Sequence, residues 1–351
     1  MTAAKTRPKR PRHRALGLSD ETVKEMYYYI LLGRALDERT WLLNRAGKIP
    51  FVISGQGQEA AQVGSAFALD KTRDVILPYY RDLAVVVAWG MTPTEAMLGS
   101  FAKAGDPSSN GRQMPGHWGS KRLRIVSGSS PVATQLPHAV GFALAAKMRG
   151  DKSVAWVSLG EGSTNQGDFH EAMNFAGVHQ LPVIVFVENN KYAISVPQAK
   201  ELAGHVADRA KSYDMPGVRV DGNDFLAVWE AVHTAAERAR SGGWPTLIEA
   251  ETYRLVPHSS DDDDRGYRSR EEVAEARKHD PVLVAAKYVH EAGLITEEED
   301  KALRERIRRE VDEATDAAEK AAYAAPEAAL GHVYANDVAG ANHADDAGGG
   351  R

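Results

Sequence analysis

The sequence predicts an α/β protein: a three-layer α/β/α sandwich on a mostly parallel sheet, with a helical C-terminal part. Two observations predict this fold class. Three short apolar runs, at 154–159, 183–187 and 246–250, are continuous rather than alternating, which is typical of strands buried on both faces. Each run is followed by a Gly-rich or polar turn and then by helical spacing, the order found in parallel βαβ units.

The first helix is predicted to begin after Ser19, whose side chain can cap the free amides of a first turn. Asp20 and Glu21 follow and favour the positive end of the helix dipole. Gly47 is the predicted end. Apolar residues recur between these limits at helical spacing, namely Val23, Met26, Tyr27, Ile30 and Leu31.

Helices are also predicted for the last third of the chain. Asp280 is placed to cap a helix that begins with Pro281. Thr296 and Glu299 have the spacing of a capping box at the start of the next helix. The charged residues between 297 and 310 then form a solvated face of that helix.

We expect one folded unit at about residues 16–334. Residues 1–15 contain six basic side chains and no acid, which predicts a disordered basic arm, with docking onto an acidic partner surface as the alternative. Residues 335–351 are mostly Ala, Gly, Asp and Asn and predict a disordered tail.

Composition excludes several classes of function. The chain has 351 residues, of which 43% are hydrophobic, but its longest apolar stretch, at 83–91, is too short to cross a membrane. The absence of cysteine excludes a disulfide scaffold, a thiolate metal site and a cysteine nucleophile, and it suits a reducing cytoplasm. With a net charge of −5, we expect no nucleic-acid partner.

The turn after the run at 154–159 is the first candidate site. Gly160 and Gly162 flank Glu161 and allow backbone amides to approach a ligand closely. A helix predicted from about 164 to 179 would direct its first amides at an anion. Because both loops of a parallel βαβ unit leave the same sheet edge, Glu161 should meet Asn190, which follows the next run. Carboxylate and amide oxygens suit magnesium bridged to a diphosphate.

The spacing of this site resembles the thiamine diphosphate motif. Gly-Glu-Gly is followed by 26 residues and then by Asn189 and Asn190. From about residue 16 to 334 the chain resembles the alpha subunit of the decarboxylating component of 2-oxo acid dehydrogenase complexes, the bacterial branched-chain type in particular. The resemblance implies the thiamine diphosphate-binding fold. Glu161 replaces the commoner Asp, and Glu188 stands where animal relatives carry Arg, so no contact is transferred to Glu188.

The resemblance also implies ligands. Glu161, Asn190 and the carbonyl of Tyr192 match magnesium ligands, whereas the turn at Gly160, Gly162 and Ser163 matches the diphosphate-binding turn. Further cofactor contacts match Tyr80, Arg81, Ser130 and Val132. A potassium site in branched-chain relatives matches Ser129, Pro131, Thr134 and Gln135, with a Ser/Pro turn that caps the following helix as the alternative.

A third stretch, at 253–268, matches the family's loop beside the cofactor. His258 matches a catalytic histidine, since imidazole can move a proton near neutral pH. Polar residues matching those that order the loop are Arg254, Asp262, Tyr267 and Arg268. Four consecutive aspartates and few apolar residues lead us to expect a loop held loosely until the cofactor binds.

The implied activity is oxidative decarboxylation of branched-chain 2-oxo acids, with transfer of the acyl group to the lipoyl group of an acyltransferase. The glutamate that activates thiamine belongs to a beta subunit in this family, and no pyrimidine-binding domain is recognised here, so the resemblance implies an α2β2 assembly. The alternatives are the alpha subunit of a pyruvate or acetoin dehydrogenase, and a non-catalytic cofactor-binding scaffold.

Overall fold

The computed structural model describes residues 11–242 and 244–331. Its central sheet has five parallel strands in the order β1-β2-β3-β7-β6. A two-stranded antiparallel sheet, β4-β5, lies beside it. The strands are β1 (Val75–Leu77), β2 (Ala155–Gly160), β3 (Val183–Asn189), β4 (Tyr192–Ala193), β5 (Val196–Pro197), β6 (Gly217–Asp221) and β7 (Thr246–Glu251).

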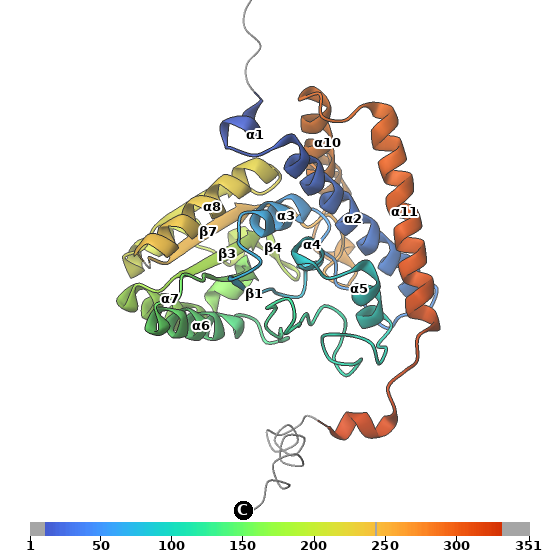
Figure 1. Ribbon diagram of the computed structural model, residues 1–351, viewed down its shortest axis with the longest axis horizontal. Helices are drawn as coiled ribbons and strands as arrows, with labels where there is room; N and C mark the ends of the chain where they lie inside the picture. The colour runs from blue at the N-terminus through green and yellow to red at the C-terminus, as the bar shows by residue number, and fades with distance from the viewer. Residues whose placement is uncertain (1–10, 243, 332–351) are drawn as a thin grey trace, which may run out of the picture.

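Helices cover both faces of the sheet and extend past one edge (Figure 1). They are α1 (Arg12–Ala15), α2 (Asp20–Arg45), α3 (Glu59–Phe67), α4 (Leu83–Trp89), α5 (Pro93–Ser100), α6 (Gln135–Arg149), α7 (Gly167–His179), α8 (Phe225–Gly242), α9 (Arg270–Arg277), α10 (Pro281–Glu291) and α11 (Glu297–Lys320). None of the helices in these residues is long and apolar enough to cross a membrane.

Alternate residues of the strands enter two separate cores. Trp156 of β2 packs with α3, α8 and the N-terminal helices, whereas Ala155 and Val157 pack with α6 and α7. This alternation follows from the two-residue side-chain period of a strand. The predicted three-layer α/β/α fold is therefore confirmed. Residues 246–250 are also a strand as predicted, but it pairs between β3 and the edge strand β6, which sequence reasoning did not identify.

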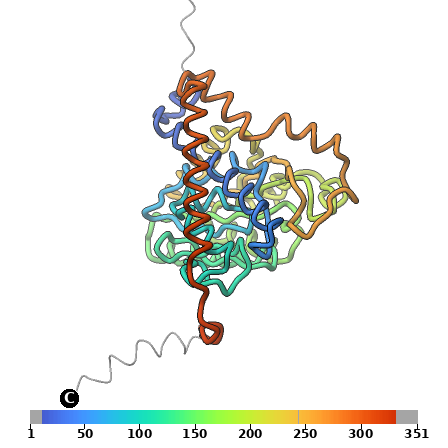
Figure 2. The backbone as a smooth tube through the Cα atoms, turned by 90° about the vertical axis from the view of Figure 1, so that its right-hand side faces the viewer, coloured from blue at the N-terminus to red at the C-terminus, as the bar shows by residue number. Residues whose placement is uncertain are grey.

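The predicted helix caps are present. Ser19 accepts a hydrogen bond from the Thr22 amide, Asp280 from the Val282 amide, and Thr296 forms a capping box with Glu299. Figure 2 shows α11, in red, running along one face of the molecule. The helical C-terminal part is therefore confirmed.

The boundary predicted for the basic arm is wrong for residues 11–15. Arg12–Ala15 form α1, Pro11 is its N-cap residue, and His13 is fully buried. Its ring nitrogens contact the Tyr288 hydroxyl at 2.7 Å and the Asp20 carboxylate at 2.8 Å. These specific contacts outweigh the local charge repulsion on which the prediction rested. Residues 1–10 and the predicted tail at 335–351 lie outside the described residues.

Candidate active site

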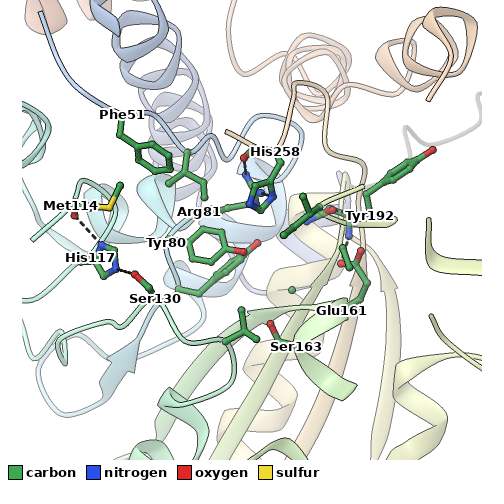
Figure 3. A pocket seen from close by; sticks show the side chains of 18 of the residues that line it. Phe51, Tyr80, Arg81, Met114, His117, Ser130, Glu161, Ser163, Tyr192 and His258 are labelled. Atoms are coloured by element: carbon green, nitrogen blue, oxygen red, sulfur yellow. Dashed lines mark hydrogen bonds between the residues drawn. The ribbon is translucent and has the colours of Figure 1, made fainter. Parts of the chain in front are cut away.

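A cavity of about 410 Å³ opens at the carboxyl ends of β2 and β3, where α/β sheets usually bind ligands. Residues from distant parts of the sequence converge on it (Figure 3). Every residue predicted to contact the cofactor lines this cavity, namely Tyr80, Arg81, Ser130, Val132, Gly160, Glu161, Gly162, Ser163, Asn190 and His258. Tyr192, the third predicted magnesium ligand, lines it as well.

Glu161 and Asn190 meet at the polar end of the cavity, as the parallel topology predicts. The backbone amide of Asn190 donates to Oε2 of Glu161 at 3.0 Å. The second oxygen, Oε1, is buried and has no hydrogen-bond partner among the described residues. Burial raises the pKa of the Glu161 carboxyl. An unpartnered buried carboxylate oxygen is costly, and a cation bound there would remove that cost.

The side chain of Asn190 is held by its neighbours. Its Oδ1 accepts from the Tyr192 amide at 3.3 Å, and its Nδ2 donates to Gln58 at 3.3 Å. The carbonyl of Tyr192 already accepts from Nη1 of Arg254 at 3.2 Å, so a cation there would use its other lone pair.

The turn after β2 differs from the prediction. Glu161–Asn165 form a 3₁₀ turn, and α7 begins only at Gly167. The predicted helix start near residue 164 is therefore wrong, and the amides beside the cavity belong to the 3₁₀ turn. Gly162 is required there, because a Cβ atom would lie 2.7 Å from Cβ of Ala193. The Thr164 hydroxyl supports the turn by donating to the Glu161 carbonyl at 2.6 Å.

Arg81 and His258 are joined by hydrogen bonds in the cavity wall. Nη1 of the buried Arg81 donates to the carbonyls of Ser54 and His258 at 2.6 and 3.1 Å. Its Nη2 lies 2.9 Å from Nδ1 of His258. Because guanidinium only donates, Nδ1 must accept and Nε2 carries the ring proton.

The electrostatics support the same assignment. Burial, and then the charges of Arg81 and Arg254, lower the pKa of His258 to about 4. The imidazole is therefore neutral at pH 7. The ring of Tyr80 lies edge-on to the His258 ring, with ring centroids 6.5 Å apart.

The four predicted loop-ordering residues form one hydrogen-bond network. Arg254 donates to the hydroxyl of Tyr267 at 2.8 Å, and Tyr267 donates to Asp262. Asp262 accepts from the backbone amide of His258 at 2.7 Å. Arg268 donates to the carbonyl of Arg254.

The loop has anchors despite its few apolar residues, whereas its loosening in the absence of cofactor stays a prediction. Arg254 and Arg268 are themselves buried, and their guanidiniums take the place of apolar anchors. The loop also pairs with residues 52–56. The backbone amide of Leu255 donates to the Gln56 carbonyl at 3.2 Å, and the backbone amide of Ser260 donates to the Val52 carbonyl at 2.9 Å.

Residues 27–327 match the family described as the dehydrogenase E1 component. The chain belongs to this family. It is 61% identical over 325 residues to the "2-oxoisovalerate dehydrogenase subunit alpha" of Bacillus subtilis, which covers 92% of this chain and 98% of that protein. It is 38% identical to the mitochondrial subunit of the same name in Homo sapiens, over 90% of this chain and 71% of that protein. It is also 38% identical to the "Pyruvate dehydrogenase E1 component subunit alpha" of Staphylococcus aureus strain Mu50, over 84% of this chain and 77% of that protein.

The loop before α6 in this E1 component chain splits into two parts. Ser130 and Val132 face the cavity, and the Ser130 hydroxyl lies 2.5 Å from Nε2 of His117. The four predicted potassium ligands do not line the cavity. Among them, the Ser129 hydroxyl donates to the Pro131 carbonyl at 3.4 Å, and the side-chain Nε2 of Gln135 donates to the Ser158 carbonyl. Thr134 stands at the start of α6 without a side-chain capping bond, so the capping alternative is not supported.

Sequence reasoning did not assign individual residues to the apolar end of the cavity. This wall includes Phe51, Ile53, Met114 and Pro115. Phe51 and Ile53 carried no signal in the sequence, because an apolar run at 51–53 is ordinary in any core.

Glu188, to which no contact was transferred, lies behind the wall. Its Oε2 accepts from Nε2 of Gln62 at 3.0 Å and contacts the Tyr79 hydroxyl at 3.3 Å. Asp82 is its buried neighbour, and burial together with the charge of Asp82 holds the pKa of Glu188 well above its ordinary value.

Proposed function

We propose that the chain is the alpha subunit of a branched-chain 2-oxo acid dehydrogenase. In this proposal it decarboxylates branched-chain 2-oxo acids oxidatively and passes the acyl group to the lipoyl group of an acyltransferase. The observation that carries the proposal is the single cavity with two chemically different ends: oxygen donors and phosphate-binding groups at one, and apolar side chains at the other. The 61% identity to the Bacillus subtilis subunit supports the choice of substrate.

The polar end has the donor set for thiamine diphosphate and magnesium. The unpartnered oxygen of Glu161, the side-chain oxygen of Asn190 and the carbonyl of Tyr192 would hold the metal. Amides of the turn at Gly162 and Ser163 and the side chains of Tyr80 and Arg81 would hold the phosphates. When bound, thiamine diphosphate supplies the carbon nucleophile that the decarboxylation of a 2-oxo acid requires.

The chain's own groups then position and protect the reacting atoms. Arg81 orients His258, and burial together with the charge of Arg81 keeps the ring neutral, so that Nε2 carries a hydrogen with which it can donate a hydrogen bond. The network of Arg254, Tyr267 and Asp262 fixes the backbone that carries His258. The pairing of residues 52–56 with residues 255–260 holds the loop in place beside the cavity.

The apolar end favours a branched acyl chain over a methyl group. A branched substrate such as 3-methyl-2-oxobutanoate carries two more carbon atoms than pyruvate. Burying them against Phe51, Ile53 and Met114 is worth about 1.6 kcal/mol, or a factor of about 15 in kcat/KM.

The test uses the chain assembled with its beta subunit and supplied with both substrates. A higher kcat/KM for 3-methyl-2-oxobutanoate supports the proposal. A reversed ratio would assign the chain to the pyruvate or acetoin group, towards which the 38% identity to the Staphylococcus aureus subunit points. Cofactor binding without turnover of any 2-oxo acid would identify a scaffold subunit.

We further propose a beta subunit in an α2β2 heterotetramer as the partner, because the relatives are named as alpha subunits. The lipoyl-bearing acyltransferase is the proposed acceptor. We also propose a potassium site formed by Ser129, Pro131, Thr134 and Gln135. The proposed location is the cytoplasm, which the absence of cysteine suits. Cofactor titration in potassium and in sodium buffers would test the cation site.

A further inference from the structure

One wall of the cavity is carried by a tightly tied loop, residues 102–117. Asp106 accepts backbone hydrogen bonds from Ser108, Ser109 and Gly111 at 2.9, 3.0 and 3.2 Å. The loop closes on itself at Gly111, where a Cβ atom would lie 2.4 Å from the carbonyl oxygen of Ala102. A loop this constrained moves as a unit, so its anchoring decides where its cavity-lining residues lie: Met114, Pro115 and His117.

The anchor is the segment that follows α11, residues 321–331, which we call the strap. The amide of Ala104 donates to the carbonyl of Ala322 at 3.0 Å. Lys103 and Tyr323 form an antiparallel bridge, and Nη1 of Arg112 donates to the Gly331 carbonyl at 2.8 Å. Figure 2 shows the chain leaving the lower end of α11 and continuing below the fold. The strap therefore holds both ends of the 103–112 stretch.

Lys103 is the buried centre of this contact, with 3% of its surface exposed. Its Nζ donates to the carbonyl of Glu319 at 3.0 Å and lies 3.7 Å from the centre of the Tyr323 ring. Among residues 11–242 and 244–331, no carboxylate forms an ion pair with Lys103. Its charge is instead balanced by the negative end of the α11 dipole and by the aromatic face.

We propose that Lys103 is a positioning residue that sets substrate affinity and selectivity from outside the cavity. It fixes the strap to the loop. The loop then holds Met114 against the cavity, and the Met114 carbonyl accepts from Nδ1 of His117 at 2.9 Å. The substrate named in this inference rests on the proposed function, whereas the contacts between the strap and the loop do not depend on it.

The experiment compares assembled enzymes that carry Lys103→Met, Tyr323→Ala, or a deletion of residues 322–351. Controls are Lys103→Arg, which keeps the charge, and a deletion of residues 332–351, which keeps every strap contact named above. We expect KM for 3-methyl-2-oxobutanoate to rise about fivefold with kcat little changed, and the preference over pyruvate to shrink. Hydrogen exchange in residues 111–117 should increase, thiamine diphosphate affinity should stay constant, and the two controls should behave as the wild type.

Unchanged KM and unchanged hydrogen exchange in residues 111–117 of the folded variants would overturn the inference. A parallel fall in kcat and cofactor affinity would also overturn it, because that result would indicate general destabilisation. Tyr323→Ala keeps the test valid if the buried substitution prevents folding, because the Tyr323 side chain is largely exposed. A wild-type enzyme inactive on every 2-oxo acid would refute the proposed function alone. In that case the exchange measurement would still decide the role of Lys103.

Discussion

The state of His258 can be tested by changing pH. Its ordinary pKa of 6.5 is lowered to about 4 in the folded chain by burial and by the charges of Arg81 and Arg254. Between these two values the unfolded chain binds a proton that the folded chain does not. The free energy of unfolding must therefore fall as the pH falls from 6.5 to 4.

The size of this effect at pH 5 follows from the two pKa values. Between pH 7 and pH 5, pKa values of 6.5 in the unfolded chain and about 4 in the folded chain correspond to about 2 kcal/mol of lost stability before solvent screening. His258 is partly exposed, so solvent screening reduces the expected loss to about 1 kcal/mol. Carboxylates elsewhere also titrate in this range, and a His258→Gln variant subtracts their contribution because it keeps them all.

Urea unfolding of the chain at pH 7 and pH 5 measures the difference. The wild type should lose about 1 kcal/mol more than His258→Gln between the two values. His138→Gln is the matched control, since His138 is an exposed residue of α6, and it should follow the wild type. Equal losses in the wild type and in His258→Gln, or a His258 ring that titrates near pH 6.5 in an NMR experiment, would refute the reasoning.

Four further predictions concern the site. Gly162→Ala should weaken thiamine diphosphate binding in calorimetry, because the new Cβ would lie 2.7 Å from Cβ of Ala193. Gly167→Ala is the control and should bind the cofactor normally, because a Cβ at Gly167 would meet no atom within 4 Å. Glu161→Ala should weaken magnesium-dependent cofactor binding at least about tenfold, or ~1.4 kcal/mol; unchanged affinity would remove Glu161 from the metal site. Tyr267→Phe should speed trypsin cleavage after Arg265, because Asp262 loses its hydroxyl donor, and equal cleavage rates would argue against the network. The chain purified alone should not decarboxylate any 2-oxo acid, and turnover by a verified monomer or homodimer would contradict the need for a beta subunit.

The sequence alone was enough for the fold class and for the polar end of the site. Continuous apolar runs mark strands buried on both faces, and parallel topology then brings the ends of two such strands together. This is why Glu161 and Asn190, 29 positions apart in sequence, are joined by a hydrogen bond. Ser19, Asp280 and Thr296 likewise marked the starts of their helices through purely local chemistry.

Only the tertiary structure decided the remaining features, because they depend on groups far apart in the chain. His13 belongs to the fold and not to a disordered arm, since its bonding partner Tyr288 lies 275 positions away. The resemblance matched Arg254 and Arg268 to loop-ordering residues, but only the structure shows that both are buried and that their guanidiniums donate to backbone carbonyls. The apolar wall at Phe51, the neutral ring of His258 and the contact of Lys103 with the strap have the same origin. A local pattern records what a residue can do, whereas burial and long-range partners determine what it does.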